Sequence, residues 1–86
     1  MSWNLLDAKQ SANGMTVTFV TEYGIELLEG SCEEFGRLAE VMQQVSVLVE
    51  LDEHEAVWIE DVAVGDAIVK LGINPGKQAR IQILRP

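Results

Sequence analysis

The spacing of apolar residues changes at Ser31, and this change constrains the fold more than any other feature of the sequence. Before it, the run MTVTFVT over residues 15–21 alternates apolar and polar side chains, which is typical of a strand with one buried face. After it, apolar residues recur at helical spacing from Phe35 to Val45. Because 86 residues leave room for one core, the two patterns together predict a single α+β domain over residues 1–86.

The residues before Ser31 are predicted to form an antiparallel meander. Residues 3–9 and 25–29 are candidate strands on either side of the run 15–21, and Asn13-Gly14 is a turn signal between the first two. In the middle strand we expect Met15, Val17 and Phe19 to face the core.

The main helix is predicted over about residues 32–44. Ser31 and Glu34 match a capping box, in which the serine hydroxyl and the glutamate carboxylate each accept a backbone N–H at the helix start. After the helix, residues 45–51 and 56–62 are rich in β-branched side chains, so we expect a hairpin with an acidic tip over residues 52–55.

Residues 67–71 are compatible with two structures. Asp66 can cap a short second helix that Gly72 ends, whereas the alternation of Ala67, Val69 and Leu71 is that of a strand. We favour the short helix.

The C-terminal residues are predicted to form a turn and a strand. Residues 74–77 have proline and glycine where a type II turn requires them, and the alternation over 78–85 indicates a last strand. The predicted fold is therefore one antiparallel sheet of about five to six strands, a meander plus a hairpin, packed against one main helix.

The run IVKLGINPGKQARIQI over residues 68–83 resembles a segment of AbrB-type swapped-hairpin domains of bacterial transition regulators and antitoxins, and also the small barrel of the FeoA family. The likeness covers less than a quarter of the chain. It is carried by Leu71, Gly72, Ile73, Pro75 and Gly76. These residues suit any junction between a helix, a turn and a strand, so the resemblance implies no function here.

Charge is distributed unevenly along the chain. The formal net charge of −8 combines −12 over residues 22–66 with +4 over residues 67–86, while the first 21 residues are neutral. An acidic body repels phosphate backbones, so direct binding to nucleic acid is not expected. A basic protein surface, or a second copy of the chain, is the expected partner.

The sequence favours a reducing, non-membrane environment. Cys32 is the single cysteine and cannot form an internal disulfide, and no apolar run reaches the length of a membrane span. We expect a cytoplasmic protein of prokaryotic or phage type, with no membrane partner and no cofactor. In the first turn of the helix Cys32 is flanked by acids, so a small half-buried residue is favoured over a reactive thiol.

Residues 50–61, ELDEHEAVWIED, hold the candidate metal ligands. Asp52, Glu53, His54 and Glu55 offer oxygen and nitrogen atoms to a divalent cation. The segment lacks the twelve-residue calcium pattern, however, and side chains that alternate along a strand do not converge. A solvated charged tip that protects a sheet edge is therefore the favoured interpretation.

The same segment supplies the predicted partner-binding residues: Glu50, Asp52, Glu55, Trp58 and Glu60. A tryptophan among carboxylates suits an Arg- or Lys-bearing surface, through ion pairs and cation–π contact. The alternative is that Trp58 fills the core.

The favoured function is binding without catalysis, by an inhibitor, antitoxin, immunity or adaptor type of protein that docks a basic partner or forms a homodimer. The first alternative is a regulatory protein that binds a divalent cation through residues 50–61. A small enzyme with a carboxylate site is the second alternative, although the sequence contains no Ser/His/Asp order, phosphate loop or paired histidines.

Overall fold

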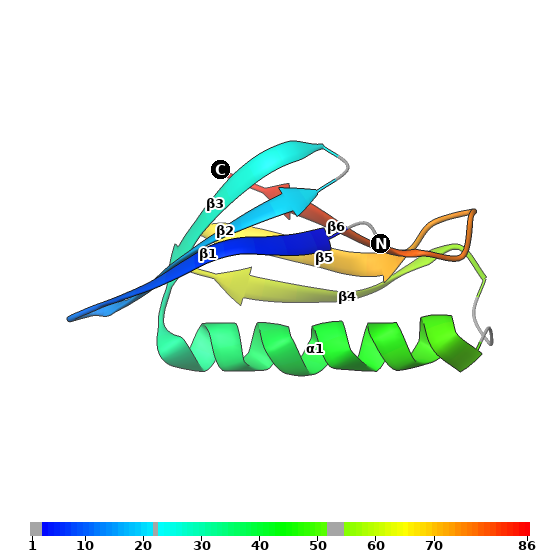
Figure 1. Ribbon diagram of the computed structural model, residues 1–86, viewed down its shortest axis with the longest axis horizontal. Helices are drawn as coiled ribbons and strands as arrows, with labels where there is room; N and C mark the ends of the chain where they lie inside the picture. The colour runs from blue at the N-terminus through cyan, green and yellow to red at the C-terminus, as the bar shows by residue number, and fades with distance from the viewer. Residues whose placement is uncertain (1–2, 22, 52–54) are drawn as a thin grey trace.

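Two antiparallel three-stranded sheets and one helix make up the fold in the computed structural model, which describes residues 3–21, 23–51 and 55–86 (Figure 1). Sheet A contains β1 (Trp3–Ser11), β2 (Gly14–Thr21) and β3 (Gly24–Gly30). Helix α1 (Cys32–Leu51) follows. Sheet B contains β4 (Val57–Val64), β5 (Ala67–Ile73) and β6 (Ala79–Leu84).

The predicted α+β class, the N-terminal meander and the main helix are confirmed, but the prediction of one sheet is wrong. Each meander completes its own three-stranded sheet, and within the described residues no strand of sheet A pairs with a strand of sheet B. Helix α1 separates them along the chain, and its 20 residues span about 30 Å. In Figure 1 helix α1 runs along the molecule beside β4, and sheet A crosses the side of the molecule opposite α1. The β1–β2 hairpin extends beyond the end of the molecule where α1 begins.

One core joins the three elements. The buried apolar side chains of sheet A, α1 and the inner face of sheet B form a single cluster. Sheet A contributes Val17, Phe19 and Leu28, and α1 contributes Phe35, Leu38, Val41 and Val45. Sheet B contributes Val62, Val64, Ala67, Val69, Leu71, Ile73, Ala79 and Ile81. Since α1 packs mainly against β4 and β5, it covers sheet B more fully than sheet A.

Helix α1 ends at Leu51, seven residues beyond the predicted end at residue 44. The β-branched run 45–51 was predicted to be half of a hairpin, and that prediction is wrong. Val45 is buried as the next position of the stripe that contains Leu38 and Val41, and Leu48 packs partly against the same core. This tertiary packing outweighs the modest helix penalty of β-branched side chains.

Residues 67–71 form part of strand β5, so the favoured short helix is wrong. Gly65 and Asp66 form the turn of a hairpin in which Val64 pairs with Ala67. Gly65 has a φ of 60°, and a Cβ there would collide with the Glu29 carbonyl oxygen. A glycine at the first position of a two-residue hairpin turn explains why Asp66 does not cap a helix.

The turn after β5 also differs from the predicted type II. The Lys77 N–H donates to the Asn74 carbonyl oxygen at 2.9 Å, as in a β-turn. The residue with positive φ is Lys77, at 60°, and not Gly76. The Asn74 side chain accepts the Gln78 N–H at 3.0 Å, which helps to fix the connection to β6.

The predicted capping box is present and reaches further than the helix. The Glu34 N–H donates to Ser31 Oγ at 3.1 Å, and Glu34 Oε1 accepts the Ser31 N–H at 2.8 Å. The same oxygen accepts the Gly65 N–H at 3.1 Å, from the turn between β4 and β5. One carboxylate therefore fastens the start of α1 to sheet B, and these backbone hydrogen bonds lower the pKa of Glu34.

In the described part of the chain, no helix combines the length and the apolar character that crossing a bilayer requires.

The Glu34 contact predicts a pH dependence of stability. Because the folded-state pKa lies below the ordinary value of 4.5, the stabilisation is complete above that pH and is lost as the pH falls through the folded-state pKa. In the Glu34→Gln variant the melting temperature should therefore fall less as the pH is lowered through this range. Thermal melts at a series of pH values measure the fall, and Glu33→Gln is the matched control. Equal dependence of melting temperature on pH in the two variants would contradict the role assigned to Glu34.

Candidate functional site

Two neighbouring apolar cavities lie along α1, one against the start of β6 and one against sheet A. Their volumes are about 410 and 400 Å³, and both are lined by Gln43 and Ser46. We call the pair the α1 groove. A groove of this size is within the range of ligand and peptide sites.

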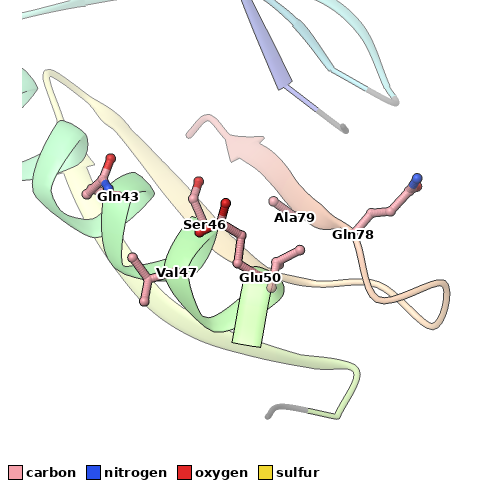
Figure 2. A pocket seen from close by; sticks show the side chains of 7 residues that line it. Gln43, Ser46, Val47, Glu50, Gln78 and Ala79 are labelled. Atoms are coloured by element: carbon pink, nitrogen blue, oxygen red, sulfur yellow. The ribbon is translucent and has the colours of Figure 1, made fainter. Parts of the chain in front are cut away.

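The first cavity lies between the C-terminal half of α1 and the start of β6. Five α1 residues line it, including Val49, and Figure 2 labels the other four, with Gln78 and Ala79 across from them. The four are Gln43, Ser46, Val47 and Glu50. Their spacing of three and four residues places them on one face of the helix.

The second cavity lies between α1 and sheet A, and its floor is the core. Sheet A lines it with Ala8, Met15, Val17 and Phe19. Helix α1 lines it with Phe35, Leu38, Ala39 and Met42 as well as the two shared residues. Met15 and Met42 are only partly buried, and flexible methionines suit a surface that adapts to an apolar partner.

The C-terminal end of the α1 groove is negative. Among the described residues, Glu50 is the only charged one that lines either cavity, and the last turn of α1 contains no basic residue. The negative end of the helix dipole therefore adds to the Glu50 charge without a cation in the last turn of the helix to offset it. Val47 and Leu51, 41% and 57% exposed, add apolar surface to the same part of α1.

The predicted partner-binding residues do not form one surface. Glu50 lines the α1 groove, whereas Trp58 and Glu60 line a different cavity on β4. Glu55 is exposed just before β4, and Asp52 lies outside the described residues. The Glu60 carboxylate is 3.6 Å from the Arg37 guanidinium, so one predicted docking charge already has a cation beside it.

The predicted metal site is untested for three of its four residues, since Asp52, Glu53 and His54 lie outside the described residues. Glu55 is exposed. Among the residues that the structure does describe, no three His, Cys, Asp or Glu side chains are close enough to hold a metal ion.

Trp58 is neither in the core nor free for an outside cation. It pairs across the sheet with Gly72, which in turn pairs with Arg80. The Arg80 guanidinium carbon lies 3.7 Å from the indole centroid, and Lys70 Nζ lies 5.3 Å from it. Both cations come from the basic C-terminal segment, so the chain itself supplies the cation–π contact that was predicted for a partner.

Another C-terminal cation also acts within the chain. Arg85 is 3.5 Å from the Glu26 carboxylate, and its guanidinium donates to the Leu27 carbonyl oxygen of β3. The basic segment therefore offsets part of the acidic body in place.

A polar cavity of about 440 Å³ beside Trp58 is lined by Glu60, Asp61 and Lys70. It meets the size expected of a small active site. Both of its carboxylates, Glu60 and Asp61, are exposed.

Cys32, expected to be half-buried, is exposed at the start of α1. Its Sγ lies 4.0 Å from the Gln10 side-chain nitrogen.

Sequence reasoning missed the α1 groove because it placed residues 45–51 in a strand. It also missed Arg80 and Lys70 as neighbours of Trp58. The glycine within the apolar run of β5 was a usable signal, since a strand glycine often marks the close approach of a large group from a neighbouring strand.

The chain matches no protein-family model, no curated protein and no solved structure.

Gly72 is predicted to be indispensable for the Trp58 contact. A Cβ at this position would collide with the Val57 carbonyl oxygen and lie 3.0 Å from Trp58 Cε3. Gly72→Ala should therefore lower the free energy of unfolding by about 1–3 kcal/mol. Urea denaturation measures the change. Gly76→Ala is the control, because its Cβ would meet only the Asn74 side chain at 3.4 Å; equal costs for both variants would contradict the close packing.

Proposed function

We propose that the protein is a non-catalytic binding domain whose α1 groove takes up an apolar segment of a partner protein, with a basic residue of that segment beside Glu50. The observation that carries the proposal is the apolar α1 groove, in which Glu50 is the one charged lining residue among those that the structure describes. An amphipathic helix in an apolar groove is a recurring mode of peptide recognition.

The groove chemistry favours a segment with one apolar face. Gln43, Ser46 and Gln78 offer uncharged polar groups along the rim, which orient a bound segment without the desolvation cost of buried charge. The floor offers methionine, valine and phenylalanine side chains, whose burial supplies the favourable free energy.

Charge favours a basic partner over a second copy of the chain. A homodimer joined through the basic C-terminal segment would need cations that are free to leave the chain. Arg85 contacts Glu26 and Leu27, so this cation of the segment already has partners within the chain. The last turn of α1, in contrast, contains no basic residue.

The test uses a capped model helix with a leucine stripe and lysines at one end, labelled for fluorescence anisotropy. Val47→Glu should weaken its binding at least about tenfold, because a charge would be buried against the apolar segment. Ile25→Glu is the control, since Ile25 is 72% exposed on sheet A and lines neither cavity.

The electrostatic part of the proposal has its own variant. Glu50→Gln should weaken binding by up to about fivefold and reduce its dependence on salt, as expected for an exposed ion pair. Glu33→Gln, at the other end of α1, should not change it. Equal binding of a peptide with glutamates in place of the lysines, or full binding to the Val47→Glu variant, would refute the proposal.

A further inference from the structure

The outer face of sheet B, away from α1, is built from three rows of side chains that cross the sheet. The rows are Trp58–Gly72–Arg80, Asp61–Lys70–Gln82 and Ala63–Ile68–Leu84. Residues between them on β5 and β6, such as Leu71 and Ile81, are buried in the core, so these side chains point outward. Ile68 and Leu84 are exposed apolar side chains at one end of this face.

Arg80 is held in place but its hydrogen-bonding groups are unused. The guanidinium stacks on Trp58, yet it makes no hydrogen bond or ion pair with any described residue, and its Nε is buried without an acceptor. A planar guanidinium fixed on an aromatic ring presents its N–H groups at the edge, in the geometry that a carboxylate accepts as a bidentate pair.

The three rows carry a charge opposite to that of the rest of the molecule. They contain Lys70 and Arg80 and one carboxylate, Asp61, which lies opposite Lys70 in the register but forms no ion pair with it among the described residues. Glu60, the neighbour of Asp61 on β4, lies beside Arg37. Arg80 is therefore the cation best placed to receive an anion from outside.

We propose that the outer face of sheet B binds an extended acidic segment of a protein, with one carboxylate on Arg80 and an apolar side chain on Ile68 and Leu84. Arg80 and Leu84 are four residues apart on β6, about 13 Å along the strand. Side chains at i and i+4 of an extended peptide have the same separation, and the residue at i+2 then lies over Lys70 and Gln82. The face selects an acid at i, an acid or polar residue at i+2 and an apolar residue at i+4.

The experiment follows Trp58 fluorescence in a Trp3→Phe background, so that Trp58 is the one tryptophan. The probe is a capped peptide with glutamate at i and i+2 and leucine at i+4, and the matched peptide has glutamine in place of both glutamates. We expect saturable binding of the acidic peptide. Arg80→Gln should weaken it at least about tenfold, because the bidentate pair is lost. Arg80→Gln also removes the group that lies over the indole, which changes the Trp58 fluorescence by itself. The affinity of this variant is therefore measured by calorimetry.

Two controls separate a site from general attraction. Lys9→Gln, an exposed cation on β1, should leave the affinity unchanged. Val47→Glu should also leave it unchanged, which distinguishes this site from the α1 groove. An unchanged circular dichroism spectrum shows that Arg80→Gln is folded; if it is not, Arg80→Lys, which keeps the charge but not the bidentate geometry, must weaken binding.

Several results would overturn the proposal: no saturable binding, equal affinity of the two peptides, or unchanged affinity in Arg80→Gln. Inorganic phosphate that binds where the acidic peptide does not would make this a small-anion site instead. Light scattering that shows a dimer lost in Arg80→Gln would make a second copy of the chain the occupant.

Discussion

The apolar stripe of α1 is the feature on which the rest of the structure depends. No described strand of sheet A is hydrogen-bonded to sheet B, so the sheets are joined through side-chain packing and local contacts. Leu38, Val41 and Val45 supply the centre of the shared core, and all three are almost completely buried. The Glu34 carboxylate then fixes the start of the helix to the Gly65 turn of sheet B, which sets where along sheet B the stripe lies.

The position of α1 also explains why the molecule has an open groove. A helix that lies mainly over β4 and β5 cannot at the same time cover sheet A. The space between them is left with apolar walls, and the neighbouring cavity between α1 and β6 carries Glu50 in a last helical turn without basic residues. On the proposed functions the two binding surfaces have opposite preferences: the α1 groove receives a basic-ended segment, and the outer face of sheet B receives an acidic one. Such a layout suits an adaptor that holds two different segments.

Local patterns in the sequence predicted those parts of the fold that local interactions decide. The alternation around Val17 and the Ser31 capping box need only neighbouring residues, and both are confirmed. The end of α1 was mispredicted because the run 45–51 has strand-forming side chains, and only packing against sheet B selects the helix. Residues 67–71 were mispredicted because Asp66 was interpreted as a helix cap, although Gly65 before it was the signal of a hairpin turn.

The candidate site was predicted only in part, for a similar reason. Glu50 and Trp58 could be singled out from composition alone. The neighbours of Trp58 depend on the register of β4, β5 and β6, which places Gly72 beneath the indole and Arg80 against it. Register is a property of three strands together, and no one of them shows it alone.

The central claim is that residues 45–51 continue α1, because Ser46, Val47 and Glu50 form a groove wall only if they lie on a helix. Solution NMR tests this directly. The account predicts helical carbon shifts and sequential amide–amide contacts through Leu51, with amides of residues 45–49 protected from exchange. Strand-like shifts over 45–51, with cross-strand contacts to residues 57–62, would contradict it and remove the groove.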